Sequence, residues 1–95
     1  MRNINIVYDD EFDHVSIFAI PDDVVPDIES LSQEYLHWIP PLDDPDGWVV
    51  IRGKTYMSKE VRGFVKWLNE KCCRGLAYVV ERDTIYRPEY PMVEF

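Results

Sequence analysis

"INIVYDDEFDHVSIFAI", residues 4–20, carries the strongest fold signal in this chain of 95 residues. Ile4, Ile6 and Tyr8 alternate with their neighbours, and the apolar residues of 14–20 alternate in the same way after the polar stretch 9–13. Period-two alternation is typical of a strand with one buried face. The stretch therefore predicts a β-hairpin that opens the domain.

A helix is predicted after this hairpin, over residues 28–39. Apolar side chains recur there at helical spacing, and Pro26 suits the first turn of a helix. Pro40 and Pro41 are expected to end the helix, because the residue before a proline avoids the α region.

Residues 48–80 predict a β-α-β unit. The short apolar runs "WVVI" (48–51) and "LAYVV" (76–80) are typical of strands covered on both faces. Between them, Ser58 offers an N-cap for a helix with one apolar face. The two strands are expected to be parallel and joined by a right-handed crossover.

The order β-β-α-β-α-β predicts an α+β fold with a single mixed β-sheet of about four to five strands and two helices. Residues 84–87 add an expected edge strand, and Pro88 and Pro91 favour an extended tail over a helix. A chain of this length, 46% hydrophobic, fills one core and not two, so residues 1–95 are expected to form one domain.

Charge is distributed very unevenly along the chain. The formal net charge is −8, and residues 1–50 hold twelve acids against the single base Arg2, whereas residues 51–95 hold six acids against nine bases. Because phosphate contacts need Lys and Arg, the acidic half is not expected to bind nucleic acid. No apolar run approaches the length of a membrane span or a signal peptide, and the two adjacent cysteines imply no disulfide framework, so a cytoplasmic protein is expected.

The acids of the first half cluster in three short segments, which we interpret as a partner-binding surface. Aromatic side chains beside carboxylates are typical of protein interfaces, and Trp48 lies two residues after the last segment. Ordinary turn chemistry and solubility explain the same clusters without a partner. The predicted partner-binding residues are Asp9, Asp10, Glu11, Asp13, Asp22, Asp23, Asp43, Asp44, Asp46 and Trp48.

No metal site or cofactor is expected. Aligning residues 42–53 with a calcium-binding loop places Leu42 at the first ligand position and Gly53 at the twelfth, where a bidentate Glu is needed. The acids around His14 could ligate a metal, but no second His or Cys cluster completes a site.

The histidines and cysteines give no catalytic motif. His14, near four acids, is expected to hold its proton more readily than a free histidine. Cys72 is predicted on the apolar face of the second helix, and Cys73 is predicted to point away from the core near Arg74, which would lower its pKa. No catalytic residue is therefore assigned.

Small size, strong acidity and the absence of a catalytic motif resemble the immunity proteins that neutralise bacterial toxins, including those of contact-dependent growth inhibition systems. The resemblance implies a one-to-one complex with a basic cognate toxin, commonly a nuclease, and assigns no residue. We therefore expect a protein-binding module and no enzyme. The alternative is a small enzyme or ligand-binding domain with a pocket beside the parallel strands.

Overall fold

The predicted opening hairpin forms the centre of the main sheet. In the computed structural model, which describes all of residues 1–95, strands β1 (Arg2–Tyr8) and β2 (Glu11–Ile20) pair antiparallel, with Ile4 opposite Phe18. Asp9 and Asp10 connect them with φ of 50° and 59°. Two consecutive positive φ angles define a type I′ turn, whose twist matches that of the flanking strands.

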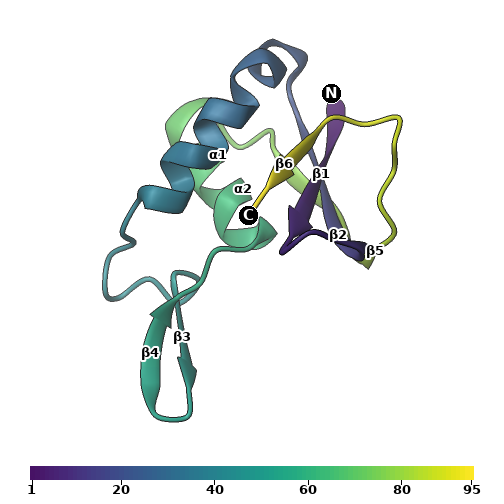
Figure 1. The fold of residues 1–95 in the computed structure, drawn as a ribbon. Helices are drawn as coiled ribbons and strands as arrows, with labels where there is room; N and C mark the ends of the chain where they lie inside the picture. Colours follow the sequence, from purple (N-terminus) through teal and green to yellow (C-terminus); the bar gives the residue numbers. More distant parts are fainter.

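Two further strands complete a mixed sheet in the order β5-β2-β1-β6 (Figure 1). Strand β5 (Tyr78–Thr84) pairs antiparallel with β2, and the short strand β6 (Met92–Glu94) pairs parallel with β1. With two helices beside this sheet, the α+β class is confirmed. The parallel strand was not predicted, because the sequence indicated only an extended tail at its position.

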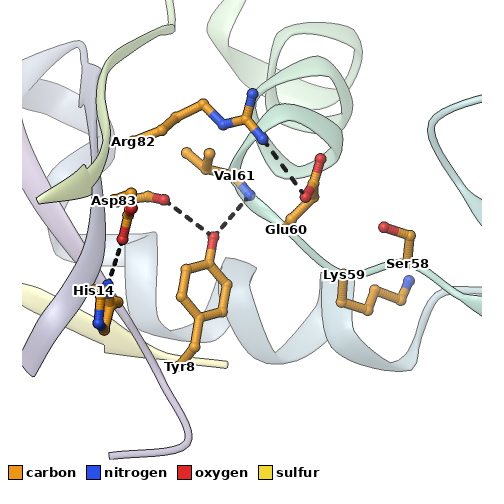
Figure 2. Close-up of a pocket in the computed structure, with 9 residues that line it drawn as sticks. Tyr8, His14, Ser58, Lys59, Glu60, Val61, Arg82 and Asp83 are labelled. Carbon is orange, nitrogen blue, oxygen red and sulfur yellow. Dashed lines mark hydrogen bonds and ion pairs between the residues drawn. The ribbon is translucent and has the colours of Figure 1, made fainter. Parts of the chain in front are cut away.

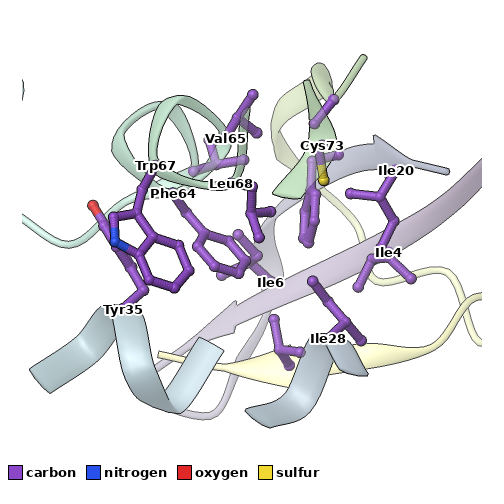
Figure 3. Close-up of a cluster of buried hydrophobic side chains, with 14 of the residues drawn as sticks. Ile4, Ile6, Ile20, Ile28, Tyr35, Phe64, Val65, Trp67, Leu68 and Cys73 are labelled. Atoms are coloured by element: carbon purple, nitrogen blue, oxygen red, sulfur yellow. The ribbon is translucent and has the colours of Figure 1, made fainter. Parts of the chain in front are cut away.

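Both helices pack on one face of the sheet (Figure 1). Helix α1 (Ile28–His37) follows a 3₁₀ segment (Asp22–Asp27) and ends before Pro40, as predicted, whereas α2 (Val61–Leu68) has Glu60 and not Ser58 at its N-cap position. Side chains from α1, α2, β1 and β2 fill the core (Figure 3). The fully or almost fully buried members include Ile4, Ile6, Phe18, Ile20, Tyr35, Phe64 and Leu68.

Lys59 joins the end of α1 to the start of α2. Its ammonium donates to the carbonyl oxygens of Tyr35 (2.8 Å) and Trp38 (2.5 Å) and lies 4.3 Å from the centre of the Tyr35 ring. Partial burial lowers the pKa of this amine. Lys59 thus satisfies the Trp38 carbonyl at the end of α1 and adds a second bond to the Tyr35 carbonyl, which already accepts from the Trp38 amide.

The other face of the sheet is also buried. Val7, Val15 and Ile17 are at most 2% exposed on this face, and the segment 85–91 covers it. Asn5, fully buried among them, donates to the carbonyl oxygen of Arg87 (2.8 Å) and accepts from the Arg87 amide (3.1 Å). This side chain therefore fastens the segment that leads into β6.

The predicted β-α-β unit is wrong. Residues 48–51 form β3 (Trp48–Ile51), which pairs antiparallel with β4 (Lys54–Met57) in a separate two-stranded sheet. Strand β5 is antiparallel to β2 and exposed for most of its length, and the expected edge strand at 84–87 is absent beyond Thr84. An apolar run of four residues does not by itself distinguish a buried strand from a strand of an exposed hairpin. Here Arg52 and Gly53, with φ of 51° and 78°, form a tight turn that reverses the chain.

The predicted orientation of the two cysteines is also wrong. Cys73 is 1% exposed and belongs to the core, whereas Cys72 is exposed. The cause is a π-helical turn (Asn69–Cys73) after α2, which adds about one residue per turn and brings the next residue toward the core. Burial, followed by the contact with the Cys72 thiol, raises the pKa of Cys73 to about 12.

Candidate functional site

The acidic turn, residues 9–13, is the exposed link between the two central strands. Asp9, Asp10, Glu11 and Asp13 are all exposed. None of these four acids takes part in any of the seven ion pairs of the structure. Unpaired carboxylates held close together create a local negative potential, which attracts a cationic surface.

Phe12 stands in the middle of the acidic turn and is 44% exposed. Its ring meets the edge of Tyr86 with centroids 5.2 Å apart and an interplanar angle of 87°. The Tyr86 amide also donates to the Phe12 carbonyl oxygen at 2.9 Å, and the neighbouring Ile85 is 66% exposed. The turn thus presents an exposed aromatic side chain, packed against Tyr86, in the same short segment as four carboxylates.

An open hollow of about 530 Å³ lies along this turn. Asp10, Glu11, Phe12, Asp13 and His14 line it. Four consecutive turn residues and the first histidine therefore share one accessible surface.

The second predicted segment, Asp22 and Asp23, lies far from the acidic turn. It follows the C-terminal end of β2, whereas the turn precedes the N-terminal end of the same strand. Ten residues of extended chain span about 30 Å. Asp22 also pairs with the N-terminal ammonium at 3.0 Å.

The third predicted segment, residues 43–46, is largely neutralised by α2. Asp44 pairs with Lys66 at 3.3 Å, and Asp46 lies 3.8 Å from Arg62. The Asp44 carboxylate also accepts from the Asp46 amide at 3.0 Å, and this bond, together with Lys66, lowers the pKa of Asp44. These two acids hold the loop in shape, as ordinary turn chemistry predicts.

Trp48 and Asp43 do not extend the acidic turn. The Trp48 indole N–H donates to the Pro41 carbonyl oxygen at 2.9 Å, which fixes the half-buried ring against its own loop. Asp43 is exposed and forms no ion pair. The ten predicted partner-binding residues therefore occupy three separate places, and only the segment 9–13 brings unpaired acids together with an exposed aromatic ring.

A second hollow, of about 470 Å³, lies between β2, β5 and the start of α2 (Figure 2). His14 Nδ1 lies 2.5 Å from Asp83 Oδ1 at its rim. Deeper inside, the Tyr8 hydroxyl accepts from the Val61 amide at 3.1 Å and donates to Ser16 at 3.4 Å, and burial raises the pKa of Tyr8. A paired histidine beside a tyrosine resembles acid–base machinery, but Ser16, the hydroxyl that accepts from Tyr8, is only 5% exposed and so is poorly accessible as a nucleophile.

The pKa of His14 is raised above its ordinary value of 6.5, first by the hydrogen bond to Asp83 and then by its charge, with smaller effects of Glu11 and Asp13. The predicted direction is confirmed, but its main cause is Asp83, which the sequence did not place beside His14. Because the folded pKa is raised, the ion pair's contribution to stability is complete below about pH 6.5 and is lost as the pH rises through the folded value.

Exchanging Asp83 for asparagine is expected to lower the pKa of His14, since the carboxylate favours the imidazolium by both charge and hydrogen bonding. An NMR titration of the His14 ring protons in the two proteins measures this directly. Equal midpoints would contradict the pairing of His14 with Asp83.

No group of three or more His, Cys, Asp or Glu side chains is arranged to hold a metal ion. Neither helix has the length and apolarity that crossing a bilayer requires.

Sequence reasoning missed Phe12 and its support by Tyr86. Phe12 is the only apolar residue within 9–13, and that isolation was the available signal. Asp83 and Tyr86 gave none, because they approach the turn only through the pairing of β2 with β5.

No protein-family model, curated protein or solved structure matches this chain.

Proposed function

We propose that this chain is a protein-binding module that docks its acidic turn on a basic surface of a partner protein and performs no chemistry itself. In the most specific form of the proposal it is an immunity protein that acts in the cytoplasm and neutralises a cognate toxin. The observation that carries the proposal is the set of four unpaired, exposed acids that share the segment 9–13 with the exposed ring of Phe12.

Electrostatics explains why such a turn suits a toxin inhibitor. Seven of the 18 acids, among them Asp44 and Glu34, form ion pairs, and four of the 11 that do not lie together within residues 9–13. Clustered carboxylates accelerate the encounter with a cationic partner and can occupy the positions that phosphates take in a nuclease cleft. Phe12 then supplies apolar contact beside the carboxylates of the acidic turn.

A second candidate function is ligand binding in the hollow that His14 and Asp83 border. Its support is the short contact between these two side chains and the presence of Tyr8 and Arg82 in the same hollow. A ligand there should shift the His14 ring signals in an NMR spectrum, whereas a partner protein docked on the acidic turn alone should protect residues 9–13 from amide exchange.

Partner capture tests the first proposal. The immobilised chain is incubated at low salt with lysate of the organism that naturally expresses it, and a bound basic protein is identified by mass spectrometry. The variant Asp9→Asn, Asp10→Asn, Glu11→Gln, Asp13→Asn is expected to retain about tenfold less of that protein, because it loses the steering charges. Asn tolerates the positive φ of positions 9 and 10, so the turn itself should persist.

The matched control changes the same number of charges at the other end of β2. It carries amides in place of the exposed acids Asp22, Asp23, Asp27 and Glu29. This control is expected to retain the partner as the wild type does. Equal losses in both variants would show that net charge alone governs binding, and would contradict a docking site at the acidic turn.

A further inference from the structure

The β3–β4 hairpin, residues 48–57, stands apart from the body of the molecule (Figure 1). Both of its faces are exposed: Val50 (68%) and Met57 (43%) lie on one face, and Ile51 (53%) and Tyr56 (48%) lie on the other. A lone two-stranded hairpin is only marginally stable in water. An apolar hairpin of this kind is therefore expected to be completed by further strands.

The two edges of the hairpin differ in charge. Strand β3 has no charged residue, whereas Lys54 begins β4. Natural proteins protect exposed edges with charges, above all with lysine, so the unprotected edge of β3 is the one that favours pairing with another strand.

The register of the hairpin shows which backbone groups that edge offers. A two-residue turn after Ile51 makes Ile51 and Lys54 a hydrogen-bonded pair, and every second pair along the hairpin is then hydrogen-bonded. The Ser58 amide donates to the Gly47 carbonyl oxygen at 2.9 Å, which agrees with this alternation. Residues 47, 49 and 51 therefore direct their backbone groups toward the opposite strand. In an antiparallel pair, hydrogen-bonded residues alternate with residues whose groups point outward. The amides and carbonyls of Trp48 and Val50 therefore face away from β4.

We propose that this edge pairs antiparallel with β3 of a second copy of the chain, around a twofold axis at Val49. Trp48 of each copy then lies opposite Val50 of the other, and each of these pairs exchanges two hydrogen bonds. The two hairpins become one four-stranded sheet, with an apolar row that runs from Tyr56 through both Val49 side chains to the second Tyr56.

Charge complementarity selects a second copy as the occupant. The hairpin carries Arg52 and Lys54 and no acid, so it is a cationic part of a chain whose net charge is −8. In the proposed register Arg52 of one copy lies opposite Asp46 of the other. Asp46 already lies 3.8 Å from Arg62, so in the dimer its half-exposed carboxylate would be shared between Arg62 and Arg52 of the other copy.

Sedimentation velocity over a concentration series tests this inference, and a reversible dimer is expected. The variant Val50→Pro removes an outward amide without removing a bond of the hairpin, so it should raise the dimer dissociation constant at least about tenfold. The variant Thr55→Pro is the matched control, because it removes an outward amide from β4; its dissociation constant should equal that of the wild type.

Charge variants provide a second readout that does not depend on proline. Arg52→Asp is expected to weaken the dimer several-fold. Arg74→Asp, at an exposed residue with nearly the same φ (53° against 51°), should leave the dimer unchanged.

Three results would overturn the inference: a monomer up to about 1 mM, Thr55→Pro as disruptive as Val50→Pro, or a dimer indifferent to both Val50→Pro and Arg52→Asp. Neutralising the acidic turn should not alter dimerisation, so this experiment and the partner capture can fail separately.

Discussion

Replacing Phe64 with alanine is expected to lower the free energy of unfolding by about 3–5 kcal/mol. Phe64 is fully buried, and its ring lies between those of four other aromatic residues. The ring centroids of Phe18, Tyr35, Trp67 and Phe95 are 5.3, 5.1, 6.1 and 5.3 Å away, respectively. Removing the ring leaves a cavity that these side chains from α1, α2, β2 and the C-terminus cannot all close.

Urea unfolding followed by tryptophan fluorescence measures this change. A domain of this size is stable by roughly 5–14 kcal/mol, so the variant should lose a large part of its stability. Phe12→Ala is the control, since that ring is 44% exposed, and it should cost about 1 kcal/mol or less. Similar losses for the two variants would contradict the placement of the core around Phe64.

Replacing Asn5 with alanine is expected to cost about 2–4 kcal/mol. The side chain is fully buried. It accepts from the Arg87 amide and donates to the carbonyl oxygens of Arg87 and Tyr90 (3.3 Å). Alanine leaves these backbone groups without their partner, and a buried polar group without a hydrogen bond is costly. The segment 85–91 should then detach before the rest of the sheet unfolds.

Hydrogen exchange resolves this local effect. The amide of Arg87 should lose its protection in Asn5→Ala, whereas the amides that join β1 to β2 should keep theirs. Asn3→Ala is the matched control on the same strand, because the Asn3 side chain forms no hydrogen bond. If Arg87 stays protected in Asn5→Ala, then Asn5 is not the residue that fastens this segment.

The local elements of the fold could be predicted where the pattern was long. The alternation in 4–20 and the helical spacing in 28–39 each extend over several periods, and both gave the right element. The run 48–51 is too short to show a period, and the turn Arg52-Gly53 lacks the Asn or Asp that usually marks a type I′ turn. Asn5 of β1 holds the C-terminal segment, but nothing in the sequence indicates which backbone groups its side chain bonds.

The candidate site could be predicted only in part. The four acids of the turn were identified, but charge counting could not reveal that Lys66 and Arg62 neutralise the loop 43–46. Nor could it place segments in space, although the ten residues of β2 hold residues 9–13 and 22–23 at opposite ends. The sequence of a segment gives its charge. Whether lysine or arginine side chains neutralise that charge depends on contacts between distant parts of the chain.

The most direct test of the central claim is the rate at which the chain associates with its captured partner, measured by stopped-flow fluorescence at several salt concentrations. Neutralising residues 9, 10, 11 and 13 is expected to slow association about tenfold at low salt and to flatten its dependence on salt, because steering charges are screened by ions. Neutralising Asp43, Asp44 and Asp46 should slow it much less. Equal rates for the wild type and the neutralised turn at low salt would contradict the assignment of the acidic turn as the docking surface.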